Sequence, residues 1–167
     1  MDDKVKKDLK KQQKNMLTLY IGLFISTIFQ FIPSAGAQVF GVLFFVILLI
    51  ASYIYRAQAN QASLQHSHSG YITKTIWIFS MFLFLGMIIA SFLADNTAIN
   101  DTMDKAKNGI VMSDTELNSI MSGYIKNNLW VFVTTLGPSF IYFFYRLAKG
   151  LNFARHNKNI PDTKNWF

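Results

Sequence analysis

The stretch TIWIFSMFLFLGMIIASFLA, residues 75–94, decides the fold of this chain. Its twenty residues include no charged side chain, and most of them are large and apolar. A helix needs about 20 mostly apolar residues to cross the hydrocarbon core of a bilayer, and only helices or closed barrels satisfy every backbone group there. The stretch therefore predicts a membrane-spanning helix.

Three further uncharged apolar runs accompany it, at residues 16–32, 39–55 and 129–145. The chain is 51% hydrophobic and contains 16 Phe in 167 residues. Such runs suit lipid-facing helices better than a soluble core, where polar residues would interrupt each helix every turn. We therefore expect an all-α fold, a four-helix transmembrane bundle over 16–154, between a lysine-rich tail (1–15) and a C-terminal tail (155–167).

The first two runs are separated by only six residues, PSAGAQ at 33–38. Pro33 stops a helix and Gly36 permits a tight reversal, which predicts a helical hairpin. A second interpretation stays open, because Ala35-Gly36-Ala37 after a basic tail and an apolar run also fits a signal-peptidase site.

The distribution of charge predicts the topology. The net charge is +7. Thirteen of the sixteen cations and four carboxylates, a net charge of +9, lie before the first run, between the second and third runs, and after the last run. The segment 95–127 has a net charge of −2. The positive-inside rule then places both termini in the cytoplasm. We expect a multi-pass protein of the bacterial inner membrane. Its basic surface is expected to bind anionic lipid and not nucleic acid.

The segment 95–127 is the one sizeable stretch outside the runs. Ser113 and Glu116 have the spacing of a capping box, and apolar residues follow at helical intervals. We expect a short amphipathic helix between the third and fourth spans. Its apolar edge supplies three candidate partner-contact residues, Leu117, Ile120 and Met121.

The sequence offers no catalytic set, and we expect neither an enzyme nor a cofactor. There is no cysteine, no charged or histidine side chain within a run, and no phosphate-binding, zinc-protease or nucleophile-elbow motif. His66 and His68 form an H-x-H pair, but a structural metal site takes four ligands. An ordinary role in packing or at an interface is the preferred interpretation of this pair, and no metal is expected.

Small residues at Gly86, Ala90 and Ala94 line one face of the third run. Small residues at this spacing allow two helices to approach closely. Packing within the bundle is the preferred interpretation, and contact with another subunit is the alternative.

Two stretches form further motifs, SHSGYITKTIW at 67–77, preceded by YRA at 55–57, and IYFFYRLAKGLN at 141–152. Together they resemble a family of small uncharacterised bacterial inner-membrane proteins. The family has Ser-His, then Ile-Arg-Thr-Phe-Trp at the start of a membrane helix, and Tyr-Arg-x-x-Lys-Gly at the exit of the last. It is loosely grouped with subunits of the chloroplast inner-envelope protein-import machinery. Lys74 replaces the usual Arg and Ile76 the usual Phe, and both the long tail and the 95–127 segment depart from the pattern.

The matching residues predict one cluster at the cytoplasmic boundary. Cations there extend to lipid phosphates, and a Trp at that depth suits an aromatic anchor. His68 and Tyr71 precede the third run and are expected to pack on the 146–150 turn. We also expect Trp77→Ala to destabilise the bundle more than His68→Ala. The interface and lipid-headgroup candidates are His68, Tyr71, Lys74, Trp77, Arg146 and Lys149.

These features predict a protein that works by contact. The expected role is a non-catalytic accessory, assembly or stabilising subunit of a larger membrane complex. Its expected partners are membrane lipids and another inner-membrane protein or a second copy of the chain. The alternative is an oligomeric channel or translocation component, which would need a continuous polar stripe along a helix face.

Overall fold

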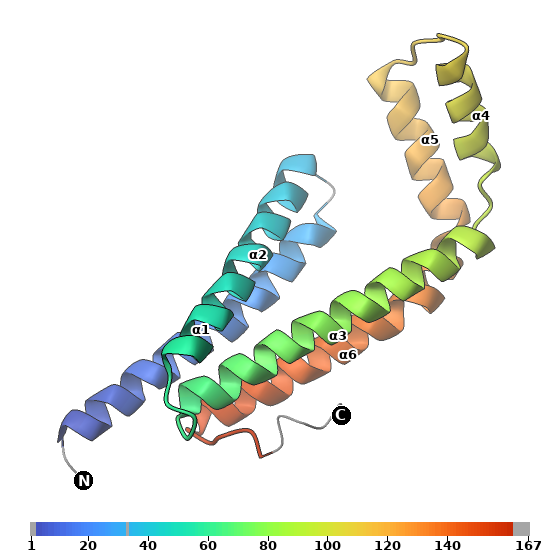
Figure 1. The fold of residues 1–167 in the computed structure, drawn as a ribbon. Helices are drawn as coiled ribbons and strands as arrows, with labels where there is room; N and C mark the ends of the chain where they lie inside the picture. Colours follow the sequence, from blue (N-terminus) through green and yellow to red (C-terminus); the bar gives the residue numbers. More distant parts are fainter. Residues whose placement is uncertain (1–2, 33, 162–167) are drawn as a thin grey trace. The chain divides into compact units, whose positions relative to one another are not determined.

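A computed structural model describes residues 3–32 and 34–161 of the chain, and every regular element in this part is an α-helix. The expected helix stop at Pro33 and the end of the tail at 162–167 lie outside the described residues. The helices, drawn in Figure 1, are α1 (Asp3–Phe31), α2 (Ala35–Gln58), α3 (Leu64–Leu93), α4 (Thr97–Lys107), α5 (Asp114–Asn127) and α6 (Leu129–Arg155).

Three of these helices are long and apolar enough to cross a membrane. The most apolar 18-residue windows of α2, α3 and α6 have mean hydropathies of 2.4, 2.4 and 1.2. The all-helical prediction is thus confirmed, and three of the four apolar runs form helices that could cross a membrane. The remaining run, 16–32, forms the C-terminal half of α1, whose N-terminal half carries the lysines.

Several helix boundaries differ from the sequence-based expectation. The lysine-rich tail is helical from Asp3, and α3 begins at Leu64 rather than near residue 75. The expected polar segment 56–74 therefore shrinks to a short connection. The physical reason is a cap, because the Ser63 hydroxyl accepts from the backbone N–H of His66 at 3.2 Å and so starts the helix early.

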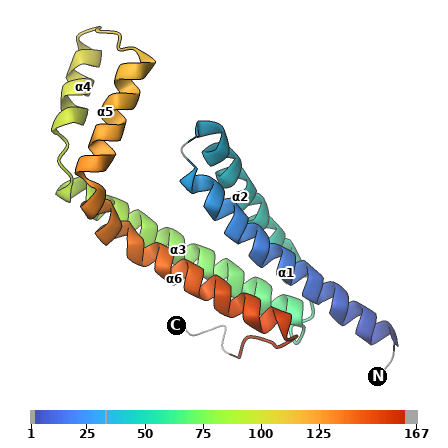
Figure 2. The ribbon, with the colours of Figure 1, turned by 180° about the vertical axis from the view of Figure 1, so that it is seen from behind.

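The helices group into two compact units, and the first comprises Met1–Phe79 and Tyr142–Phe167. It holds α1, α2, the first part of α3 and the last part of α6. Figures 1 and 2 show α1 and α2 as an antiparallel hairpin. Phe143 is fully buried and its ring centroid lies 4.4 Å from that of Phe79, which joins α6 to α3. Phe24 stacks on Phe144 at 5.7 Å and joins α1 to α6.

The second unit, Ser80–Ile141, contains the rest of α3, the whole of α4 and α5, and the start of α6. A Cβ atom at Gly86 would lie 2.6 Å from the backbone oxygen of Thr135 on α6, so only glycine fits. Ala90 and Ala94 are 3% and 8% exposed. The small-residue face of α3 therefore packs within the chain, which confirms the bundle-packing interpretation.

The segment between α3 and α6 folds as a hairpin of two helices where one was expected (Figure 1). The capping box that starts α5 is confirmed: the backbone N–H of Glu116 donates to the Ser113 hydroxyl, and that of Ser113 donates to the Glu116 carboxylate at 3.0 Å. Helix α4 escaped prediction because its sequence, TAINDTMDKAK, is largely polar, and its N-cap residue, Asn96, makes no side-chain cap hydrogen bond.

One buried amide closes this hairpin. The Asn128 Oδ1 atom accepts from the backbone N–H of Asp95 at 2.7 Å, and its Nδ2 group donates to the backbone oxygens of Asp95 and Tyr124. The Tyr124 hydroxyl donates to Asn96 at 3.0 Å. Asn128 is 3% exposed, so these bonds form in a desolvated position and stabilise the junction where the hairpin leaves and rejoins the long helices.

Candidate functional site

A buried group of hydrogen-bonding side chains lies in the first unit, where α1, α3 and α6 meet. We call it the polar cluster. Each of its members is at most 3% exposed. The sequence-based expectation included three of them and missed the other two. The members are Tyr20, His68, Tyr71, Thr75 and Arg146.

His68 joins three segments of the chain. Its Nε2 atom lies 3.0 Å from the backbone oxygen of Lys158, and its Nδ1 atom lies 3.0 Å from the Tyr20 hydroxyl. A carbonyl oxygen only accepts hydrogen bonds, so Nε2 must carry the proton. In the neutral ring Nδ1 then accepts from Tyr20. Both ring nitrogens are engaged, and the His68 imidazole is thus a structural link between α1, α3 and the segment after α6.

Gly150 makes room for Tyr20. A Cβ atom at this position would collide with the hydroxyl end of the Tyr20 ring. Gly150 is the last residue of the Tyr-Arg-x-x-Lys-Gly stretch of α6. Packing against Tyr20 explains why this chain has a glycine at that position. It lets α1 and α6 approach closely enough for Tyr20 to reach His68.

Arg146 is held inside the polar cluster and does not extend to the surface. It is 2% exposed. Its Nε atom donates to the Thr75 hydroxyl at 3.0 Å and Nη1 donates to Tyr142 at 3.1 Å. The guanidinium carbon lies 4.1 Å from the centroid of the Tyr71 ring, a favourable cation–π distance. The expectation that this side chain extends to lipid phosphates is wrong, because these partners surround it.

Tyr71 and Thr75 complete the connection between α3 and α6. The Tyr71 hydroxyl donates to the backbone oxygen of Arg146 at 3.2 Å, and the Thr75 hydroxyl donates to the backbone oxygen of Tyr71 at 2.8 Å. Each hydroxyl has a partner within the chain, as buried polar groups require. The predicted packing of Tyr71 on the 146–150 turn is confirmed by its bond to the Arg146 carbonyl. The bonds of His68 go to Tyr20 and to the Lys158 carbonyl.

The other three interface candidates lie toward the outside of the first unit. Lys74 is half-buried, and Trp77 is 59% exposed. Trp77 Nε1 donates to the Tyr53 hydroxyl at 2.7 Å. Lys149 is half-buried, with its Nζ atom 5.9 Å from the centroid of the Tyr145 ring. Their place at a membrane boundary stays a prediction.

A groove of about 510 Å³ lies beside Lys74, between the end of α2 and the start of α3. Thr73 lines this groove, and its buried hydroxyl lies 3.0 Å from that of Ser52, which joins the same two helices. The groove has a mixed lining, with cations and aromatic rings side by side. Its lining includes Tyr53, Arg56, His66, Thr73, Lys74 and Trp77.

Hydrogen bonds also fix the chain after α6. The Gln13 amide donates to the backbone oxygens of Ala154 and Arg155 at 3.1 and 2.9 Å, which satisfies carbonyls at the end of α6. The backbone N–H of Ile160 donates to the Ser67 hydroxyl at 3.0 Å. The basic half of α1 and the start of α3 thus hold the segment that supplies the Lys158 carbonyl.

The partner-contact candidates lie on α5. Leu117 and Met121 are 38% and 49% exposed, and Ile120 is half-buried. The apolar edge therefore faces outward, as expected. Hydrogen bonds from Ser113 hold the pKa of Glu116 below its ordinary value, because they stabilise the carboxylate. Bonds from the hydroxyl and the backbone N–H of Thr97 lower the pKa of Asp95 in the same way.

The polar cluster connects α1, α3 and α6 through hydrogen bonds. Within residues 3–32 and 34–161, no group of three or more His, Asp or Glu side chains is placed to hold a metal ion. The cluster's hydroxyls and its imidazole are committed to partners inside the chain. Comparison of the chain with known protein families, characterised proteins and solved structures gives no match.

Proposed function

We propose that this chain is a four-span protein of the bacterial inner membrane that serves as a non-catalytic accessory, assembly or stabilising subunit of a larger membrane complex. The three apolar helices α2, α3 and α6 support the membrane location. The fourth span in this proposal is the apolar half of α1, which pairs with α2 as a hairpin (Figure 2). The family resemblance at 67–77 and 141–152 belongs to the same proposal.

Both termini lie in the cytoplasm in this arrangement. The α1 lysines and the cations near the ends of α2 and α6 then share one side of the membrane, and the α4–α5 hairpin lies on the other. The positive-inside rule supports this orientation, since cytoplasmic segments are enriched in Lys and Arg.

One observation supports the contact role above all. The hydrogen-bonding groups at the centre of the first unit are directed at one another, whereas large apolar side chains cover the outside of the long helices. Phe92, Phe84, Ile47 and Ile141 are 83%, 62%, 60% and 72% exposed. Such a surface offers lipid or another membrane protein a place to pack. A translocation path would need polar groups in its lining, which this surface does not supply.

The partner in this proposal is another inner-membrane protein that docks on the apolar edge of α5. Leu117, Ile120 and Met121 supply the edge, and the Asn128 junction holds the hairpin that presents it. Exposed apolar side chains outside the bilayer favour burial against a partner, at about 25 cal/mol per Å² of apolar area.

The test is purification of the tagged chain from its native membrane under mild detergent, with identification of the proteins that co-migrate. Leu117→Asp with Met121→Asp should release the partner while the long helices still insert. The matched control is Asn118→Asp with Ser122→Asp, which adds the same charge to exposed positions of the same helix and should leave the complex intact.

Two outcomes would reject the proposal. One is a native chain that migrates alone. The other is passage of ions or peptides across liposomes that contain the purified chain and nothing else, which would favour the channel alternative.

A further inference from the structure

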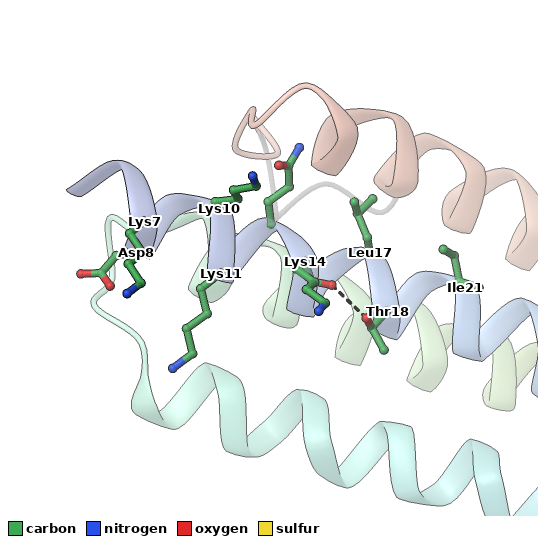
Figure 3. A pocket seen from close by; sticks show the side chains of 9 residues that line it. Lys7, Asp8, Lys10, Lys11, Lys14, Leu17, Thr18 and Ile21 are labelled. Atoms are coloured by element: carbon green, nitrogen blue, oxygen red, sulfur yellow. Dashed lines mark hydrogen bonds between the residues drawn. The ribbon is translucent and has the colours of Figure 1, made fainter. Parts of the chain in front are cut away.

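An open cavity of about 680 Å³ follows the surface of α1, across the point where the helix changes from basic to apolar, and all of its lining residues belong to this helix. Lys7, Lys10, Lys11 and Lys14 line its first part, and Leu17 and Ile21 line its far end (Figure 3). We propose that this cavity binds one anionic phospholipid, with its phosphate among the lysines and an acyl chain along the apolar end.

The spacing of the lining residues supports an elongated ligand. Positions 7, 10, 14, 17 and 21 are three or four residues apart, so they follow one another along the same side of the helix. With a rise of 1.5 Å per residue, the lysines cover about 10 Å of the axis and the apolar end about 10 Å more. A single phospholipid has the length to contact both parts.

The positive charge of the lysine-lined part of the cavity favours an anionic ligand. Four lysines and one carboxylate, Asp8, line the cavity, which leaves a net charge of +3. No described carboxylate lies within salt-bridge distance of the four ammonium groups. No such pair therefore diminishes their attraction for a phosphate.

The apolar end of the cavity favours an amphiphilic ligand over a free anion. Ile21 is 49% exposed and Leu17 is half-buried, so both have apolar surface left to cover. The Thr18 hydroxyl donates to the backbone oxygen of Lys14 at 3.0 Å, and this bond leaves its methyl group for contact with the ligand (Figure 3). A free phosphate would gain nothing from this end, whereas an acyl chain would.

This inference rests on the membrane location in the proposed function and is independent of the partner on α5. The experiment uses the full chain in detergent with equal amounts of phosphatidylglycerol and phosphatidylcholine, and native mass spectrometry measures which lipid is retained. The test variant is Lys11→Gln with Lys14→Gln. The matched control is Lys6→Gln with Lys158→Gln, which removes the same charge from exposed positions outside the cavity.

We expect the wild-type chain to retain phosphatidylglycerol in preference to phosphatidylcholine. The test variant should lower the retained phosphatidylglycerol at least about fivefold, since each lysine near an anionic headgroup contributes strongly to binding. The control should stay within about twofold of wild type. Inorganic phosphate at millimolar concentration should not displace the lipid. Circular dichroism of both variants checks that the helices are retained.

Three results would overturn the inference. The first is equal retention of phosphatidylglycerol by the test variant and the wild type. The second is an equal loss in both variants, which would indicate diffuse attraction to the whole basic surface. The third is full displacement by inorganic phosphate, which would indicate a site for a free anion. None of these results depends on whether a protein partner docks on α5.

Discussion

His68 donates its Nε2 proton to the backbone oxygen of Lys158, ninety residues further along the chain. This bond determines the tautomer of the ring and makes Nδ1 the acceptor for Tyr20. One side chain near the start of α3 thus connects α1 with the segment that follows α6. The sequence analysis named His68 as an interface or lipid-headgroup candidate, and the structure buries it completely inside the first unit.

Substitution of His68 should therefore destabilise the chain more than substitution of Trp77. His68→Ala removes a fully buried ring and leaves the Tyr20 hydroxyl and the Lys158 carbonyl without it, at a cost of about 2–4 kcal/mol. Trp77→Ala removes an exposed ring and one hydrogen bond, at about 1 kcal/mol. Thermal unfolding in detergent, followed by circular dichroism, measures both. The expected order of the two stability losses is the reverse of the one that side-chain size predicts. A larger loss of stability for Trp77→Ala than for His68→Ala would contradict the buried role of His68.

Gly150→Ala should destabilise the first unit, because the added methyl group collides with Tyr20. Overpacking of this kind costs about 1–3 kcal/mol. Gly123→Ala in α5 is the control, since its Cβ position faces open space in the structure. It should be neutral or slightly stabilising, because Ala favours a helix over Gly. Equal unfolding midpoints for the two variants would refute the close contact between α1 and α6.

The start of α5 should weaken in acid. The folded-state pKa of Glu116 lies below its ordinary value of 4.5, because Ser113 donates hydrogen bonds to the carboxylate. A lowered pKa means that the stabilisation is complete above about pH 4.5 and is lost as the pH falls through the folded-state value. NMR titration of the Glu116 carboxyl and the Ser113 amide measures this. Ser113→Ala should raise the pKa only part of the way toward 4.5, since the backbone N–H at position 113 still donates to the carboxylate. A Glu116 pKa at or above 4.5 in the wild-type chain would contradict the capping box.

Reporter fusions test the topology. A fusion after residue 110 should report the outer side of the membrane, and fusions after residues 62 and 160 should report the cytoplasm. The reason is the excess of cations on the tails and on the segment after α2. A cytoplasmic signal from residue 110 would reject the orientation.

The sequence was sufficient to predict the helices that depend on local properties of the chain. The apolar run at 75–94 and the capping box at Ser113 predicted α3 and α5 because length, hydropathy and cap chemistry are local properties. The four-span count stays a prediction, because the polar half of α1 precedes its apolar run.

The contacts inside the polar cluster could not be predicted from the sequence to the same extent. Arg146 follows an aromatic run at a membrane boundary, and a cation there ordinarily extends to lipid. Its burial depends on Tyr71 and Thr75, which lie more than seventy residues earlier in the chain. Tyr20 was missed for a similar reason, since a single tyrosine in an apolar run gives no sign of which distant nitrogen it will reach.

The Asn128 amide has a consequence for how the chain tolerates change. It pairs with both backbone groups of Asp95, so the hairpin leaves the long helices and returns to them at nearly one point. The polypeptide between these two residues is a cassette with adjacent ends. An engineer could excise it for a short linker, or graft another module in its place, while α3 and α6 keep their alignment.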